Sequence, residues 1–115
     1  MLRGEIRMVN LDPARGAEAA KQRPAVIVSN DGVNTTASRL GWGVITVVPV
    51  TSNVSRVYPF QVLLPADRTG LPRDSKAQAE QVRSIAVERV GSRVGQLPPE
   101  LTSVLDDALR LHLDL

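Results

Sequence analysis

The chain of 115 residues contains no cysteine and only one histidine. Without cysteine it can form no disulfide scaffold, thiolate nucleophile or cysteine-based metal site. A single histidine does not build a usual transition-metal site, and no P-loop, GxGxxG, HExxH or EF-hand motif occurs. Aromatic residues make up 3% of the chain, so the aromatic platforms on which several RNA-binding folds stack bases are largely missing.

Long apolar runs are also missing. None approaches the roughly 18 residues of a membrane span, and no segment joins a basic start to an apolar core. We therefore expect a cytoplasmic protein without a membrane partner, folded as a single domain over residues 1–115. The net charge is only +2, but the pI is 9.7, which mildly favours an anionic partner.

The apolar runs that do occur are short, rich in β-branched residues and separated by turn formers. They predict strands over residues 2–11, 24–29, 43–50, 58–64 and 90–97. Pro49 indicates an edge or bulge in the third of these. Several short strands and few helices are typical of a mainly β fold, in which a small, strongly bent sheet or barrel carries a terminal helix.

The helical signals are uneven along the chain. Residues 30–38 are dense in turn formers and predict at most about one helical turn, while residues 75–87 fit helix and strand equally well. Pro98-Pro99 and the apolar spacing that follows predict a helix over the last residues, with His112 packed on its apolar stripe.

Polar groups stand at the ends of two predicted strands. Arg23 precedes one buried strand, and Thr51-Ser52-Asn53 follows another directly. If both lie at the same rim, guanidinium and hydroxyl donors form a cradle for an oxyanion or phosphate, with Glu18 and Glu80-Gln81 adding polar contacts. For each residue alone a structural role stays open, such as a surface arginine, a threonine that closes a turn or a solvent-facing glutamate.

Several short motifs follow one another in a specific order and spacing. They are Gly4-Glu5-Ile6, Asp12-Pro13 with Gly16-Ala17-Glu18, Arg23-Pro24-Ala25-Val26, Val48-Pro49-Val50-Thr51-Ser52, Tyr58-Pro59-Phe60 and Glu80-Gln81-Val82-Arg83-Ser84-Ile85. In this order they resemble the MazF/PemK family of ribonuclease toxins. The resemblance implies a small SH3-like antiparallel β-barrel with a C-terminal helix. It also implies a homodimer that cleaves single-stranded RNA without metal or other cofactor and is inhibited by a MazE-like antitoxin.

The same resemblance assigns roles to individual residues. It makes Arg23 the catalytic arginine and Thr51 the catalytic threonine. The RNA 2′-hydroxyl supplies the nucleophile, and the products are a 2′,3′-cyclic phosphate and a 5′-hydroxyl. The general base stays open, and Glu18 fits only if its loop closes over the substrate. The positions that match the family's RNA groove, or adjoin it, are Glu18, Asn30, Ser52, Asn53, Glu80 and Gln81.

Two departures from the family pattern affect the expected sequence preference. Arg7 stands where the family often has an aromatic residue, and Ala17 where it often has serine. Two other hypotheses use the same fold: a CcdB-like toxin that poisons DNA gyrase by binding, and an RNA-binding barrel without catalysis. The first does not need Arg23 and Thr51, and the second predicts binding without new RNA ends.

Overall fold

The computed structural model describes residues 1–11 and 22–115. Glu18, Ala17 and the loop predicted before Arg23 therefore lie outside the described residues. Seven strands form within the described part: β1 (Glu5–Asn10), β2 (Gln22–Ile27), β3 (Val44–Thr51), β4 (Gln61–Leu64), β5 (Ser75–Gln78), β6 (Arg83–Ala86) and β7 (Val90–Gln96). The helices are α1 (Asp31–Leu40), α2 (Ala66–Thr69) and α3 (Pro99–Leu113), with short 3₁₀ turns η1 (Ala79–Gln81) and η2 (Val87–Arg89).

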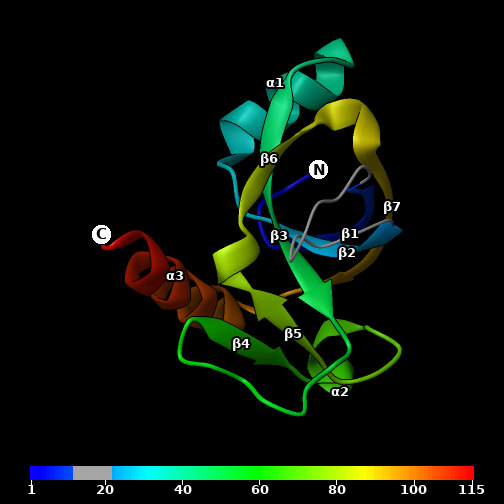
Figure 1. Ribbon diagram of the computed structural model, residues 1–115. Coiled ribbons are helices and arrows are strands. Elements are labelled where there is room, and N and C mark those ends of the chain that lie inside the picture. The colour runs from blue at the N-terminus through cyan, green and yellow to red at the C-terminus, as the bar shows by residue number, and fades with distance from the viewer. Residues whose placement is uncertain (12–21) are drawn as a thin grey trace.

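All recorded strand pairs are antiparallel, in the order β4-β5-β3-β2-β1-β7, with β6 paired to β3. Within the described residues no ladder joins β6 to β7, so the sheet bends strongly but does not close. Figure 1 shows α3 packed beside β4, where it also contacts η1, and α1 near the start of β3. The prediction of a small antiparallel β fold with a C-terminal helix is confirmed.

β3 is the strand that joins the two halves of the sheet. One of its edges pairs with β2, and the other pairs with β6 up to Val47 and with β5 from Val50. Pro49 lies between these two pairings, where neither β6 nor β5 pairs with β3. Proline has no backbone N–H to donate and is tolerated at such an unpaired edge. Because β3 continues past this change of partner, its last residue, Thr51, lies beside β5.

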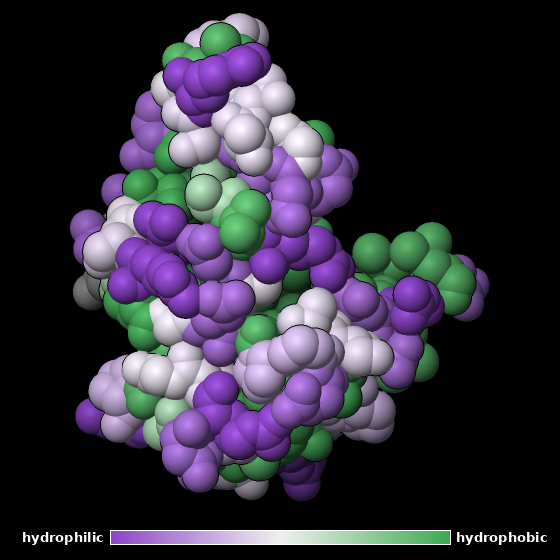
Figure 2. All heavy atoms as spheres, turned by 180° about the vertical axis from the view of Figure 1, so that it is seen from behind, coloured by the Kyte–Doolittle hydropathy of each residue, from purple (hydrophilic) through white to green (hydrophobic). Residues whose placement is uncertain are grey.

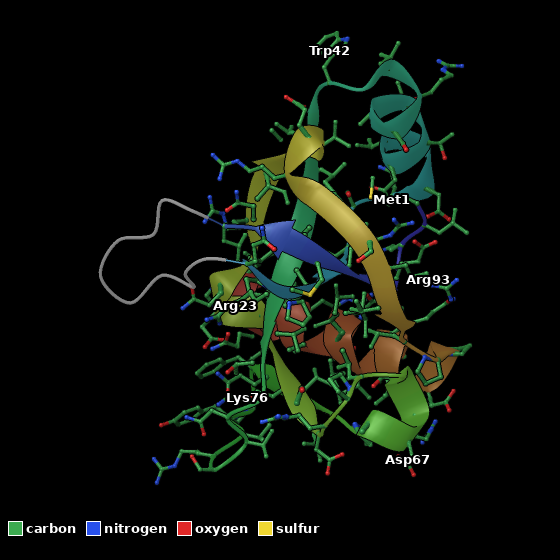
Figure 3. All side chains as sticks on the ribbon, turned by 90° about the vertical axis from the view of Figure 1, so that its right-hand side faces the viewer. Met1, Arg23, Trp42, Asp67, Lys76 and Arg93 are labelled. Carbon is green, nitrogen blue, oxygen red and sulfur yellow. The ribbon has the colours of Figure 1, made fainter. Side chains whose placement is uncertain are left out.

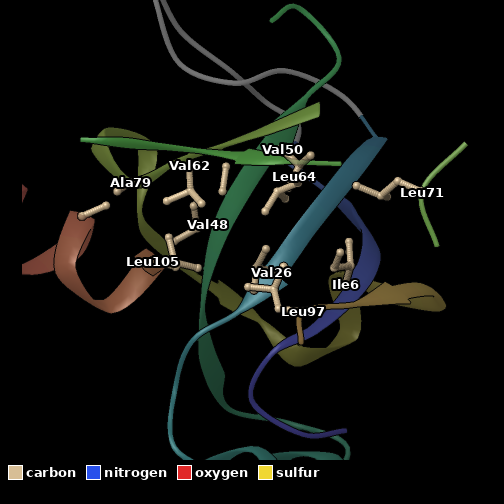
Figure 4. Close-up of a cluster of buried hydrophobic side chains, with 12 residues drawn as sticks. Ile6, Val26, Val48, Val50, Val62, Leu64, Leu71, Ala79, Leu97 and Leu105 are labelled. Carbon is tan, nitrogen blue, oxygen red and sulfur yellow. The ribbon is translucent and has the colours of Figure 1, made fainter. Parts of the chain in front are cut away.

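Two apolar clusters stabilise the fold. The first lies between the two halves of the sheet and α3, and Figure 4 shows most of its side chains. The second lies beneath α1 and is completed by β1, β2, β3 and β6. Alternate residues of β2 serve different clusters, since Val26 belongs to the first and Ala25 and Ile27 to the second. Burial on both faces holds the strand that carries Arg23 in a fixed position.

The prediction for residues 30–38 was wrong, because α1 is a helix of ten residues. The Asn30 side chain caps its N-terminus by accepting a hydrogen bond from the Val33 backbone N–H. Gly41 ends it in the left-handed conformation, at φ 72°. Asn34 and Ala37 are buried on its inner face. Caps and tertiary packing therefore outweigh the poor helix propensity of the segment.

Three further predictions need correction or completion. The strand predicted over residues 58–64 is shorter, because β4 begins only at Gln61 and Tyr58 to Phe60 lie outside it. Residues 75–87, which fitted helix and strand equally well, form β5, η1, β6 and the start of η2. The backbone N–H of Gln61 donates to the Tyr58 carbonyl, which closes a turn before β4. His112 is exposed at the end of α3 and is not packed on the apolar stripe.

Candidate functional site: a pocket at the ends of β2 and β3

Arg23 and Thr51 line the same pocket, whose volume is about 280 Å³. Its walls come from the start of β2, the end of β3, the connection between α2 and β5, and the first residue of β5. The lining residues are Arg23, Pro24, Val50, Thr51, Ser52, Leu71, Pro72, Arg73 and Ser75. The two predicted catalytic residues and Ser52 are thus brought together, as the expectation of a shared rim required.

The register between β2 and β3 explains this convergence. Ala25 pairs with Pro49, Val26 with Val48 and Ile27 with Val47. If this antiparallel register is continued by two residues, back along β2 and forward along β3, Arg23 comes opposite Thr51. Both side chains then point to the same face as Ala25 and Pro49. Side chains that stand opposite each other in this way lie within reach of one small ligand.

The Thr51 hydroxyl is oriented by the turn that follows it. Its oxygen accepts a hydrogen bond of 3.3 Å from the Asn53 backbone N–H, which leaves its hydrogen to donate elsewhere. The Asn53 side chain in turn accepts from the Ser55 backbone N–H at 3.3 Å and from the Ser55 hydroxyl at 2.9 Å. Asn53 therefore builds the turn, whereas Ser52 lines the pocket.

Arg73 and Ser75, neither of which was a candidate from the sequence, also line the pocket. Arg73 lies in the connection between α2 and β5, and Ser75 begins β5. Asp74 holds this segment in place by accepting a hydrogen bond of 2.8 Å from the Ala66 backbone N–H. The arginine and the neighbouring turn residues give the only sequence signal. The lining contains two guanidinium groups and no carboxylate, so the pocket favours an anion.

A basic and aromatic cluster adjoins the pocket on the β5 side. Lys76, which pairs with Thr51 across β3 and β5, donates from Nζ to the Arg56 carbonyl at 2.6 Å. The Tyr58 and Phe60 rings stack with centroids 5.3 Å apart, and the Arg56 guanidinium lies 5.4 Å from the Tyr58 centroid. Although aromatic residues are scarce, two of the three in the chain are gathered here, and Tyr58 is exposed.

The remaining predicted site residues lie elsewhere. Glu80 and Gln81 form η1, and one Glu80 carboxylate oxygen accepts a hydrogen bond of 2.7 Å from the Gln61 amide. The other Glu80 oxygen is buried without a hydrogen-bond partner among the described residues. Asn30 caps α1 and borders a separate apolar pocket beside Trp42. Asn30 is thus the one described candidate that the structure ties to a different pocket.

Within residues 1–11 and 22–115, no three histidine or acidic side chains are grouped so that they could hold a metal ion. In the same part of the chain, no helix is long and apolar enough to cross a membrane.

Comparisons with known proteins agree along nearly the whole chain. A family model described as the PemK-like, MazF-like toxin of type II toxin–antitoxin systems matches residues 2–113. Endoribonuclease MazF9 of Mycobacterium tuberculosis is 65% identical over 115 residues, which is 100% of this chain and 98% of the relative. Endoribonuclease toxin MazF of Escherichia coli is 38% identical over 98 residues, covering 84% of this chain and 79% of the relative.

Solved structures show the same fold. MazF from Deinococcus radiodurans superposes with a TM-score of 0.80 at 25% identity and covers 100% of this chain and 97% of its own. An endoribonuclease in complex with its cognate antitoxin, from a Mycobacterial species, superposes with a TM-score of 0.77 at 21% identity, covering 100% and 96%.

Proposed function

We propose that this chain, which belongs to the family of PemK-like, MazF-like toxins of type II toxin–antitoxin systems, cleaves single-stranded RNA at the pocket between Arg23 and Thr51. The names of its relatives favour an endoribonuclease toxin over a gyrase poison or a non-catalytic RNA-binding barrel. The observation that carries the site assignment is the β2–β3 register, because it brings a guanidinium and a hydroxyl together over one small pocket.

The reaction needs little from the protein beyond positioning and charge stabilisation. The 2′-oxygen of the RNA attacks the adjacent phosphorus, the bond from phosphorus to the 5′-oxygen breaks, and that oxygen takes up a proton. The 2′-hydroxyl proton passes to a general base, a role for which Glu18 stays a prediction outside the described residues. The products are a 2′,3′-cyclic phosphate and a 5′-hydroxyl.

Arg23 supports the step in which negative charge builds on the phosphorane. A guanidinium presents its donors in a planar fork that fits two non-bridging phosphate oxygens, and the Thr51 hydroxyl donates a further hydrogen bond. Arg23 lies near the start of a strand whose later residues are buried on both faces, so the position of its backbone is fixed before substrate binds. A guanidinium remains protonated at neutral pH and is a poor general base.

The RNA strand extends from this pocket over the β5 side. Arg73 contributes a second cation at the pocket, and the exposed Tyr58 ring with its neighbouring Arg56 and Lys76 offers a face on which a base can stack. Ser52 adds a polar contact inside the pocket, and the family resemblance implies further RNA contacts outside it from Glu80 and Gln81 in η1.

The test is cleavage of a long mixed RNA by the purified protein in EDTA. We expect cleavage with cyclic-phosphate and 5′-hydroxyl ends, its loss in Arg23→Ala, and its retention in Arg93→Ala. Arg93 is a matched control because it lies on the opposite side of the molecule from Arg23 (Figure 3). Intact RNA with the native protein, or cleavage that survives Arg23→Ala, contradicts the proposal.

A cognate MazE-like antitoxin and a second copy of the chain are the proposed protein partners, and the cytoplasm is the proposed compartment. The C-terminal end of α3 exposes Leu111, Leu113 and Leu115, and Figure 2 shows apolar atoms gathered on this projecting end. Apolar surface of this kind favours burial against another chain. Light scattering on the native protein should give the mass of a dimer, and Leu113→Glu should shift it towards the monomer.

A further inference from the structure

A second pocket opens at the ends of β1 and β2, on residues that the Arg23 pocket does not use. Its volume is about 590 Å³, within the usual range for small-molecule sites. Strands β1, β2 and β7 form most of its wall, and η2 and the last residue of β6 complete it. The lining residues are Met8, Val9, Asn10, Gln22, Ala86, Glu88, Arg89, Val90 and Gly91.

The polar side chains of this pocket include a hydrogen-bond donor, an acceptor and two groups that can both donate and accept. Asn10 and Gln22 carry amides that both donate and accept, Glu88 accepts only and Arg89 donates only. Arg89 is held in place because its Nη1 donates to the Asn10 carbonyl at 3.3 Å. In the part of the chain that the structure describes, the Glu88 carboxylate is exposed and takes part in no recorded hydrogen bond or ion pair.

The remaining wall of the pocket is apolar and closely packed. Met8 and Val90 line it, and Gly91 lies so near β1 that a Cβ at this position would approach the Met8 carbonyl oxygen to 3.2 Å. The strands therefore meet here without an intervening side chain. An apolar surface below a rim of mixed donors and acceptors suits a flat, polar-edged group such as a nucleobase, whose face stacks while its edge is hydrogen-bonded.

The pocket is joined to the catalytic pocket through neighbouring residues. Gln22 lines the second pocket and Arg23 the first, and on β1 their partners are Asn10 and Val9. Consecutive residues of a strand are only about 3.8 Å apart between Cα atoms. Their side chains point to opposite faces of β2, so RNA bound at Arg23 has to pass across the end of the β1–β2 pair to place a neighbouring nucleotide in this pocket.

We infer that this pocket binds a base of the RNA that flanks the cleaved bond, and that Glu88 selects a base with an amino group over uracil. The inference rests on the proposed ribonuclease function. Cytosine, adenine and guanine each offer an amino group that donates to a carboxylate. In uracil the single edge N–H lies between two carbonyl oxygens, which repel the carboxylate.

The experiment compares cleavage sites in a randomised single-stranded RNA library, read by sequencing the new 5′ ends. The native protein should exclude uracil at one fixed position beside the cut. Glu88→Gln should raise the share of uracil there by roughly ten- to a hundredfold, since one good base contact carries discrimination of this order. Asp67→Asn is the matched control, because this carboxylate lies on α2 at the far end of the molecule (Figure 3).

Cleavage by Glu88→Gln with an unchanged base preference overturns the inference but leaves the ribonuclease proposal intact. If the native protein does not cleave, the ribonuclease proposal fails, and binding decides the inference separately. For this, oligocytidine and oligouridine RNAs are titrated at fixed salt. Tighter binding of oligocytidine by the native protein, lost in Glu88→Gln and kept in Asp67→Asn, supports the base pocket, and equal binding of the two RNAs overturns it.

Discussion

Arg23 and Thr51 each lie two residues beyond Ala25–Pro49, the last pair of the β2–β3 ladder, and both line one pocket. The turn after β3 fixes the Thr51 oxygen, and the two apolar clusters fix the strand beneath Arg23. Because the pocket lining contains arginines and hydroxyls but no carboxylate, its own residues stabilise charge and do not accept the nucleophile's proton.

The first prediction concerns the geometry of the guanidinium. Arg23→Ala should lower the cleavage rate by roughly a hundred- to a thousandfold, the usual loss when one preorganised oxyanion donor is removed. Arg23→Lys keeps the charge but not the planar fork, so it should recover only part of this loss. Single-turnover cleavage of a short RNA with one site measures the effect. Full activity in Arg23→Lys would show that charge alone suffices.

The second prediction separates the effect of the Thr51 hydroxyl on cleavage from the effect of the branched shape of the side chain. Thr51→Val keeps the branched side chain but loses the donor, and should slow cleavage about a hundredfold if the hydroxyl contacts the phosphorane. Thr51→Ser keeps the hydroxyl and should remain active. Thermal unfolding of both variants controls for loss of the turn, since Val at this position cannot accept the hydrogen bond from the Asn53 backbone N–H. Equal activity in the two variants would remove Thr51 from the mechanism.

The sequence predicted the central strands because these depend on local pattern. The meeting of Arg23 with Thr51–Ser52 was expected only if the two strand ends share one rim, which depends on the pairing of β2 with β3. β-Branched runs specify β2 and β3, and polar residues directly after such runs lie at strand ends. Arg73 and Ser75 were not predictable in this way. They reach the pocket through the α2–β5 connection, whose position depends on tertiary contacts such as the Ala66–Asp74 hydrogen bond.

α1 shows why helix propensity alone failed to predict a helix of ten residues. Thr35, Thr36 and Gly32 weaken its propensity, but the Asn30 cap and the burial of Asn34 and Ala37 stabilise it. The exposure of His112 follows from the geometry at the other end of the chain. α3 packs on the sheet through Leu105 and Ala108, and its last turn projects beyond the sheet (Figure 1).

The third prediction concerns Asn34, which is completely buried in α1. Its amide donates to the Ser29 carbonyl at 2.8 Å, its oxygen accepts from the Ser29 hydroxyl, and that hydroxyl accepts from the Thr46 backbone N–H at 3.1 Å. Asn34→Ala leaves partly buried groups of Ser29 without their Asn34 partner and should lower the free energy of unfolding by about 1–3 kcal/mol. Urea unfolding measures it, and the exposed Thr35→Ala is the control. Equal stability of the two variants would exclude this network as a support of α1.

The fourth prediction concerns Arg7, which departs from the family's usual aromatic residue. Its Nη2 lies 2.9 Å from a Glu5 carboxylate oxygen, and its Nη1 donates to the Gly91 carbonyl at 3.2 Å. Burial by itself raises the pKa of the Glu5 carboxyl, but hydrogen bonds from Arg7 and the Leu2 backbone N–H, with the Arg7 charge, lower it overall.

A lowered pKa in the folded state means that the Glu5 carboxylate stabilises the protein above its ordinary pKa of 4.5. That contribution is lost as the pH falls through the lower, folded-state pKa. Urea unfolding of the native protein and Glu5→Gln, measured between about pH 6 and pH 3, should therefore show a stability difference that shrinks towards acid pH. Arg7→Met should raise the pKa of Glu5 and move the loss to higher pH. A stability difference that stays constant with pH would mean that Glu5 contributes through packing and not through its charge.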